Sequence, residues 1–166
     1  MYIIKTREVK TPERWTELSS WIDFFIPTDL TIENVKFTPL EDNSWTKYIK
    51  DNTIFIQPWE WVLIPTWIKM IIEPWFDLVF DNKSWVASKK WLIIWAKVVD
   101  ADYRWEVHIH LINTSNSLKT LKLWEKVAQA IIRPIVLVLP QIITDEEFEK
   151  ACNTERGDGW FWSTWV

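Results

Sequence analysis

Glycine is the residue that this chain most conspicuously lacks. Its 166 residues include 2 glycines, whereas a globular chain of this length usually has about 12. A single cysteine, Cys152, excludes an internal disulfide and fits a reducing cytoplasm. An apolar run of 18 residues and a charged-then-apolar leader are also missing, which predicts a soluble cytoplasmic protein without a membrane partner. The formal net charge of -4 argues against nucleic acid as a general partner.

Tryptophan, by contrast, is abundant, with 15 copies. Many follow residues typical of turns, as in PWEW (58–61), LIPTW (63–67), EPWFD (73–77) and SKKW (88–91). Glycine supplies a positive φ in such places, whereas an aromatic residue normally packs within a strand. Replacing tryptophan by glycine turns each string into an ordinary turn, so the sequence suggests that tryptophan stands where glycine is expected.

Short strands dominate the rest of the chain, which predicts a β-sandwich or barrel in a single domain. The strands are β-branched or alternating segments separated by turn residues, at 68–72, 76–80, 107–112, 118–123 and 135–139. Thr144 and Glu147 form a capping-box pattern, which predicts one helix of about two turns. Residues 30–52, with Pro39 and the turn signal at 42–44, resemble an extra excursion or hairpin.

Two strings carry candidate chemistry. VVDADYRWEV (98–107) places Asp100, Asp102 and Tyr103 at the expected turn of a β-hairpin. NKSWVASKK (82–90) gathers lysines and serines in what, with glycine at position 85, would be a phosphate-holding loop. Each string taken alone favours a solvated turn or a solvated basic loop over a functional site, because Asp is common at turns.

With tryptophan read as glycine, five segments in order resemble the motifs of the trimeric dUTPases, the dUTP nucleotidohydrolases. These are SSWID (19–23), NKSWVASKKW (82–91), WAKVVDADYRWEV (95–107), LWEKVAQAII (123–132) and RGDGWFWSTW (156–165). The resemblance implies an all-β fold, a distorted jelly-roll β-sandwich or barrel with one short helix near the C-terminus. It divides the chain into a β domain at 1–155 and a mobile glycine-rich arm at 156–166.

The same resemblance implies roles for individual residues. Asp100 is the expected general base for the attacking water, and Tyr103 lies under the deoxyribose and excludes a 2′-hydroxyl. The backbone from Ala96 to Val98 pairs with uracil. The phosphate and arm contacts fall on Lys83, Ser84, Trp85, Gln129, Arg156, Phe161, Ser163 and Thr164. Arg156 is expected to clamp the γ-phosphate and Phe161 to stack on the base.

The implied reaction is hydrolysis of dUTP to dUMP and pyrophosphate by water attack at the α-phosphorus. Mg²⁺ is expected on the triphosphate and its waters, without a protein ligand set. The implied assembly is a homotrimer in which three subunits build each site, so that a monomer is inactive. Asp23 of the first motif is expected to be structural.

Two features depart from the family pattern. Lys83 stands where many relatives have arginine, and its ammonium cannot grip phosphate in the bidentate way of a guanidinium. Trp85, Trp105, Trp160 and Trp162 stand where backbone must approach the nucleotide or turn tightly, so the literal sequence is expected to be inactive.

A uniform decoding difference explains the tryptophans. Nine of them fall where the family has glycine, namely Trp21, Trp67, Trp85, Trp91, Trp105, Trp124, Trp160, Trp162 and Trp165. A gene in which UGA encodes glycine, translated with a code that reads UGA as tryptophan, would yield this chain; a deliberate redesign is the competing explanation. The hypothesis predicts tryptophans at turns, exposed or at positive φ, and not in one aromatic core.

Two other proteins remain as alternatives. A carbohydrate-binding β-sandwich would use exposed tryptophans as sugar platforms, although these tryptophans do not alternate along one strand face as a platform requires. A dCTP deaminase of the same fold would release ammonia. His108 and His110 are interpreted as polar or interface residues, because two histidines without a further ligand make a poor metal site.

Overall fold

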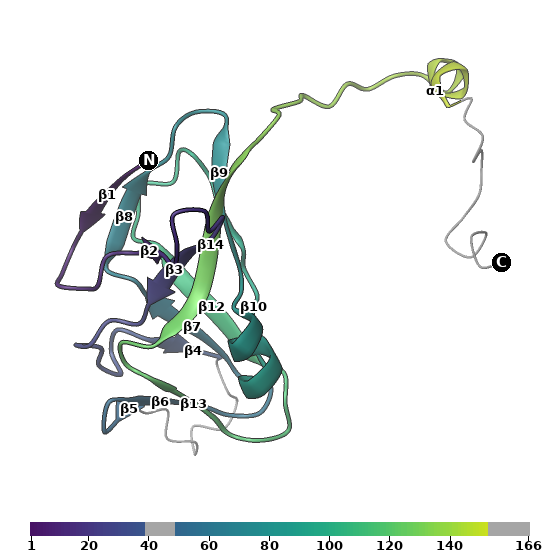
Figure 1. Ribbon diagram of the computed structural model, residues 1–166. Helices are drawn as coiled ribbons and strands as arrows, with labels where there is room; N and C mark the ends of the chain where they lie inside the picture. The colour runs from purple at the N-terminus through teal and green to yellow at the C-terminus, as the bar shows by residue number, and fades with distance from the viewer. Residues whose placement is uncertain (39–48, 153–166) are drawn as a thin grey trace. The chain divides into compact units, whose positions relative to one another are not determined.

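The computed structural model describes residues 1–38 and 49–152. It divides into two units, Met1–Ile135 and Val136–Val166. The first unit is built almost wholly of antiparallel strands, as the sequence predicted (Figure 1).

The largest sheet has five strands, and its centre is the long strand β14. The strand order is β11 (Val98–Val99), β9 (Phe76–Asn82), β14 (Lys126–Pro134), β3 (Ile22–Phe25) and β2 (Glu13–Arg14). In register, Gln129 of β14 lies opposite Asp23 on one side and Asp81 on the other. This pairing brings segments more than 100 residues apart in the sequence into one surface.

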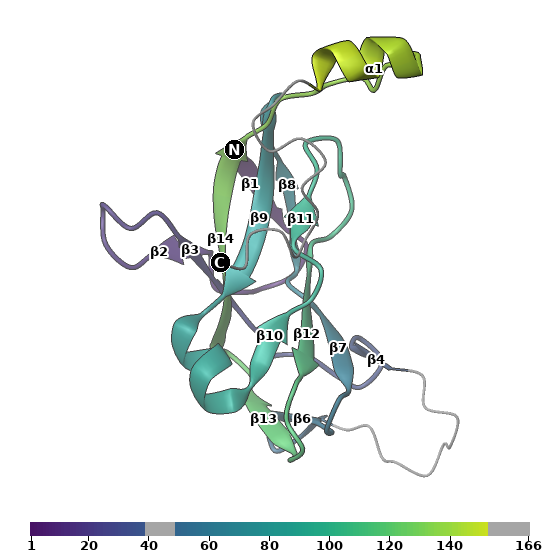
Figure 2. The same ribbon diagram turned by 90° about the vertical axis from the view of Figure 1, so that its right-hand side faces the viewer.

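A four-stranded sheet lies beside the first, and Figure 2 shows its strands side by side. Its order is β10 (Leu92–Ile94), β12 (His108–Asn113), β7 (Trp61–Pro65) and β4 (Lys36–Phe37). Two smaller sheets complete the unit: β13 (Lys119–Lys122), β6 (Thr53–Ile56) and β5 (Ile49–Lys50), and the pair β1 (Tyr2–Lys5) and β8 (Ile68–Ile71).

Apolar side chains that alternate along these strands form one core. The largest fully buried members are Phe24, Phe80, Ile26, Ile54, Ile56, Ile64, Ile68, Leu78, Leu92, Ile109, Leu111 and Leu121. Phe24 of β3 and Phe80 of β9 meet edge to face, with ring centroids 4.9 Å apart. Burial of this kind contributes roughly 25 cal/mol per Å² of apolar surface, so the core is the main source of stability.

Most of the predicted elements are confirmed. Strands occur in four of the five predicted segments, as β8, β9, β12 and β13. The predicted helix is α1 (Asp145–Ala151), and Thr144 and Glu147 make the reciprocal capping-box bonds that the pattern predicted. The predicted excursion at 30–52 is described in part: β4 and β5 lie within it, while Pro39 and the turn at 42–44 lie outside the described residues.

The strand predicted at 135–139 is wrong. This segment has no strand partner among the described residues, and Val136, Leu137, Val138 and Leu139 are exposed. The β-branched pattern indicates only that a segment suits a strand, since the strand itself requires a paired neighbour.

The tryptophans lie mainly at turns and on the surface, as the decoding hypothesis predicted. Five have positive φ: Trp59, Trp67, Trp75, Trp91 and Trp124. Of these five, only Trp67 is buried. The described tryptophans therefore form no common aromatic core. The prediction of positive φ fails for Trp15, Trp21, Trp61, Trp85, Trp95 and Trp105; the φ of Trp85 is -73°.

Candidate functional site

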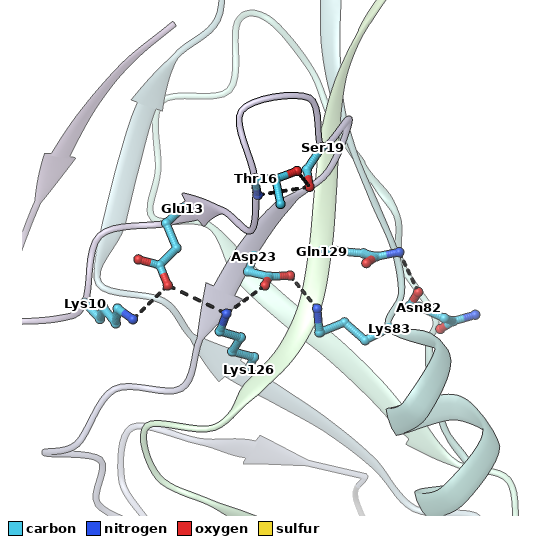
Figure 3. Close-up of polar contacts among 9 residues, drawn as sticks. All are labelled: Lys10, Glu13, Thr16, Ser19, Asp23, Asn82, Lys83, Lys126 and Gln129. Atoms are coloured by element: carbon cyan, nitrogen blue, oxygen red, sulfur yellow. Dashed lines mark hydrogen bonds and ion pairs between the residues drawn. The ribbon is translucent and has the colours of Figure 1, made fainter.

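The first candidate site is a cavity of about 400 Å³, here called the charged cavity. It is lined by Trp15, Ser19, Ser20, Trp21, Asp23, Lys83, Trp85, Lys126 and Gln129. Strands β3 and β14 and the segment after β9 each contribute side chains to it (Figure 3). The cavity therefore combines residues of the first, second and fourth sequence segments.

Asp23 is the electrostatic centre of the charged cavity. Its carboxylate is 5% exposed and accepts from the Nζ of Lys83 at 2.5 Å and from the Nζ of Lys126 at 3.1 Å. Figure 3 shows the two ammonium groups approaching different carboxylate oxygens. A buried carboxylate requires such partners, because unpaired burial of a charge is costly. Asp23 thus fixes the position of both cations.

A second carboxylate extends this network toward the surface. Glu13 of β2 lies 3.6 Å from Lys126 Nζ and accepts a hydrogen bond from Lys10 Nζ at 2.8 Å. The Lys10 bond lowers the pKa of Glu13, with a smaller contribution from the charge of Lys126. Lys126 also lies over the Trp15 ring, 4.8 Å from its centroid. Three ammonium groups therefore surround two carboxylates, which leaves a net positive charge for an anion.

Gln129 of β14 also lines the charged cavity. Its Nε2 donates to the carbonyl oxygen of Asn82 at 2.9 Å, which orients the amide. The Asn82 side chain accepts from the backbone N–H of Ile94 at 2.6 Å, tying β9 to β10. These bonds hold the strand ends that carry Lys83 and Gln129 in fixed positions.

The segment after Lys83 differs from the predicted loop. It forms a helical turn, η1 (Val86–Lys90), with Trp85 at its N-cap. Buried Val86 anchors this turn to the core. Trp85, which is 45% exposed, lines the charged cavity together with Trp15 and Trp21. The three indoles thus line the cavity that also contains the two cations.

The second candidate site is a cavity of about 220 Å³ around residues 96–103, here called the turn cavity. Its lining includes Ala96, Val98, Asp100 and Tyr103. A turn closed by the bond from Tyr103 N to Asp100 O, at 3.1 Å, positions the last two. The Tyr103 hydroxyl donates to the Glu106 carbonyl at 3.0 Å, which fixes the ring.

The predicted hairpin at 98–107 is wrong in its pairing. Strand β11 pairs with β9, with Val98 opposite Val79, whereas β12 pairs with β10 and β7. The two flanking strands thus belong to different sheets, and the turn crosses between them. Local residue types indicated the turn correctly, but strand partners depend on long-range packing.

His108 and His110 also line the turn cavity. His110 lies between two indoles, with ring centroids 5.0 Å from Trp61 and 6.3 Å from Trp95. Burial lowers the pKa of His110, and its buried Nε2 has no hydrogen-bond partner among the described residues. Within residues 1–38 and 49–152, no three His, Cys, Asp or Glu side chains gather as a metal-ligand set.

The two cavities bring together seven of the predicted site residues: Ala96, Val98, Asp100, Tyr103, Lys83, Trp85 and Gln129. Ser84 is exposed beside Lys83 and lines neither cavity. Arg156, Phe161, Ser163 and Thr164 lie outside the described residues. Sequence reasoning missed Lys126, although it lies three residues before Gln129 within the fourth segment.

Comparison with known proteins gives a consistent result. The family model for dUTPase matches residues 51–165. The deoxyuridine 5′-triphosphate nucleotidohydrolase of Nautilia profundicola is 36% identical over 113 residues, which are 67% of this chain and 76% of that protein. That of the Wolbachia of Culex pipiens is 35% identical over 118 residues, covering 69% and 74%.

Solved structures share the fold. The dUTPase of Staphylococcus bacteriophage 80alpha, solved with dUPNHPP, has a TM-score of 0.72 at 20% identity and covers 99% of this chain and 98% of its own. The Streptococcus mutans dUTPase has a TM-score of 0.58 at 19% identity, covering 78% and 88%. No helix in the described part of the chain is long and apolar enough to span a membrane. With the family match covering most of the chain, and the motif residues gathered at two cavities of this fold, the chain belongs to the dUTPase family.

Proposed function

We propose that this protein hydrolyses dUTP to dUMP and pyrophosphate, and that Asp100 is the base for the attacking water. The observation that carries the proposal is the turn cavity, where Asp100 lies with Ala96, Val98 and Tyr103. These residues come from the motif expected to hold uracil and deoxyribose. A carboxylate beside a bound α-phosphate can orient a water and accept its proton.

The charged cavity supplies the proposed triphosphate site. Lys83 and Lys126 approach one buried carboxylate, Asp23, and both ammonium groups line the cavity. Each can donate further hydrogen bonds, because an ammonium group has three N–H donors. Lys83 is a point charge in place of a bidentate guanidinium, so the second cation, Lys126, compensates for a looser phosphate grip.

Substrate selection follows from the same turn. The Tyr103 ring, fixed through its hydroxyl by Glu106, lies under the deoxyribose in the proposed complex and excludes ribonucleotides. Backbone groups from Ala96 to Val98 bind the uracil edge. In the proposed complex this backbone lies against C5 of the base and leaves no room for a 5-methyl group, which rejects dTTP.

The proposed active assembly is a homotrimer with shared sites. The charged and turn cavities have no lining residue in common, and in the proposed trimer one nucleotide binds the charged cavity of one copy and the turn cavity of another. The segment after β14 also exposes Val136, Leu137, Val138 and Leu139. Consecutive exposed apolar residues of this kind are typical of a protein interface.

Magnesium is the proposed cofactor, held by the triphosphate and water. Mg²⁺ prefers oxygen ligands and dehydrates reluctantly, so a few carboxylates together with substrate phosphates suit it better than a closed protein site. Asp100 and Asp23 are separate carboxylates in separate cavities, which fits an ion that arrives with the nucleotide. A phage phi11 dUTPase structure of the same fold is described with a structural Mg(II) ion. When bound, the ion neutralises phosphate charge.

The domain organisation is part of the proposal: a β domain at 1–155 and an arm at 156–166. In this proposal Arg156 holds the γ-phosphate, Phe161 stacks on the base, and Ser163 and Thr164 close over the phosphates. Truncation before Arg156 is expected to leave a folded trimer with little pyrophosphate release. Sedimentation reports the trimer; full activity of the truncated protein would contradict the shared site.

The cytoplasmic location stays a prediction.

The central test uses the chain with glycine at all 15 tryptophan positions. Asp100→Asn is expected to retain dUTP binding and to lower turnover by about 10²–10⁴-fold, the usual contribution of a general base. Asp51→Asn is the matched control, because Asp51 lies in the exposed β5–β6 turn and Asn suits that turn equally. Turnover of Asp100→Asn equal to that of the control would remove Asp100 from this role. Ammonia release from dCTP would instead indicate a deaminase.

A further inference from the structure

Seven non-glycine residues have positive φ in the described structure, and five of them are tryptophan. Their φ values are 61° for Trp59, 56° for Trp67, 71° for Trp75, 56° for Trp91 and 67° for Trp124. A bulky residue is a genuine outlier in this left-handed region, because its Cβ is close to backbone atoms. Tryptophan, which is among the residue types least suited to this region, therefore makes up most of the residues found there.

Three of these tryptophans occupy the same position of the same kind of turn. Hydrogen bonds join the N–H of Glu60 to Gln57 O at 3.1 Å, that of Phe76 to Glu73 O at 3.2 Å, and that of Glu125 to Lys122 O at 3.2 Å. In each case the tryptophan is the third residue and alone has positive φ. This is the pattern of a type II turn, whose third residue is normally glycine and whose second is often proline. Pro58 and Pro74 occupy the second position in two of them.

Trp91 occupies another position that favours glycine. It ends η1 with φ 56° and ψ 29°, and its N–H donates to Ala87 O at 3.1 Å. Glycine is the usual residue at such a left-handed helix end. Its indole is 56% exposed, so packing offsets little of the conformational cost.

Trp67 differs because its ring is buried. Its Nε1 donates to Asp29 Oδ1 at 2.7 Å, and the Arg7 guanidinium lies 4.5 Å from the ring centroid. These contacts lie at the ring and leave the backbone at φ 56°. The ring contacts therefore do not account for the left-handed backbone at the link from β7 to β8, which glycine adopts without strain.

We infer that residues 59, 67, 75, 91 and 124 are glycine in the protein as its own cell makes it. The inference rests on backbone geometry and is independent of the proposed activity. Substitution by drift would introduce several residue types, whereas a codon read differently introduces one type at every site. UGA is the codon that one genetic code reads as glycine and another as tryptophan.

The first test compares two purified variants of the full chain by thermal unfolding. One carries Trp→Gly at the five positive-φ positions; the matched control carries Trp15→Gly, Trp21→Gly, Trp85→Gly, Trp95→Gly and Trp105→Gly, where φ is not positive. The first variant is expected to raise Tm by about 10 °C through five relieved outliers. The control is expected to leave Tm unchanged or lower it, because added glycines increase unfolded-chain entropy. An unchanged Tm in the first variant, or an equal rise in both, would overturn the backbone argument.

The second test reads the identity of the residues directly. Peptide mass spectrometry on the protein from its native cells, alongside the coding DNA, is expected to give glycine masses and UGA codons at the five positions. UGG codons with tryptophan masses would refute the inference whatever the Tm result. Because neither readout involves dUTP, failure of the proposed function would leave both results unaffected.

Discussion

Two turns of the molecule use the left-handed backbone with very different residues. Between β5 and β6 the loop is Asp51–Asn52, with φ 49° and 54°, and Asp and Asn are the residues that tolerate this conformation in a two-residue hairpin. Between β8 and β9 the turn contains Trp75 at φ 71°, with an indole that is 63% exposed. The first turn agrees with its sequence and the second does not.

The strands that these turns connect agree with their sequence throughout. Ile54 and Ile64, on neighbouring sheets, are 0% exposed. Buried polar residues have partners too: Asn113 donates from its amide to three carbonyl oxygens. Among the described residues, the disagreement between residue type and backbone lies at the five tryptophans with positive φ, where glycine is the usual residue.

The largest expected effect on stability lies in the strands. Ile64→Ala removes a side chain that is 0% exposed and is expected to lower the unfolding free energy by about 2–5 kcal/mol. Ile4→Ala, on a residue that is 62% exposed, is the matched control and should change it by less than about 0.5 kcal/mol. Urea unfolding measures both. Equal effects would mean that the core is not where the fold is stabilised.

The next effect separates the charged cavity from the outer surface. Asp23→Asn leaves Lys83 and Lys126 without their shared carboxylate and is expected to cost about 3 kcal/mol, as for other buried ion pairs. Asp81→Asn breaks the more exposed pair with Lys97 and should cost less than about 1 kcal/mol. In the chain with glycine at all 15 tryptophan positions, Asp23→Asn should also raise the KM for dUTP. A small stability loss at Asp23 would show that the two ammonium groups position themselves without it.

A smaller effect tests the two turns one residue at a time. Trp75→Gly is expected to stabilise the chain by about 1 kcal/mol, because glycine has no Cβ to strain at positive φ. Asn52→Gly should change the stability by only a few tenths of a kcal/mol, roughly the difference between two residues suited to that turn. The urea midpoint reports both changes. If Trp75→Gly destabilises the chain, indole packing outweighs the backbone cost.

The smallest effect concerns the acid side of the stability curve. Because burial lowers the pKa of His110 in the folded chain, the unfolded chain binds more protons below the unperturbed value of about 6.5. Stability is therefore expected to fall as pH drops through about 6.5 toward the folded pKa. Glycine at Trp61 and Trp95 exposes His110 and should reduce this loss, and His110→Gln should abolish it. Tm measured between about pH 7.5 and 5 tests this, and the loss should be largest in the unaltered chain, smaller with glycine at Trp61 and Trp95, and absent in His110→Gln.

The sequence predicted local structure better than pairing. Thr144 and Glu147 specified their helix through adjacent bonds, and β-branched alternation located β8, β9, β12 and β13. The partner of β11 and the lack of a described strand at 135–139 depend on contacts far along the chain, which local propensity does not encode.

The same division holds for the candidate site. The motif order identified Lys83, Asp100, Tyr103 and Gln129, all of which line the two cavities. The bond between Asp23 and Lys126 joins residues 103 positions apart, so only the folded β3–β14 register reveals it. Three tryptophans line the charged cavity, namely Trp15, Trp21 and Trp85. Of these, the sequence pattern predicted only Trp85 to lie beside the nucleotide.

Pyrophosphate release from dUTP, measured side by side for the printed sequence and for the chain with glycine at all 15 tryptophan positions, tests the central claim most directly. We expect the glycine chain to hydrolyse dUTP in the presence of Mg²⁺ and to leave dTTP and dCTP intact. We expect the printed sequence to release no measurable pyrophosphate, because three indoles line the charged cavity where the backbone must approach the nucleotide. Equal turnover by both chains would contradict the expected inactivity of the printed sequence, and no dUTP hydrolysis by a folded glycine chain would contradict the proposed function.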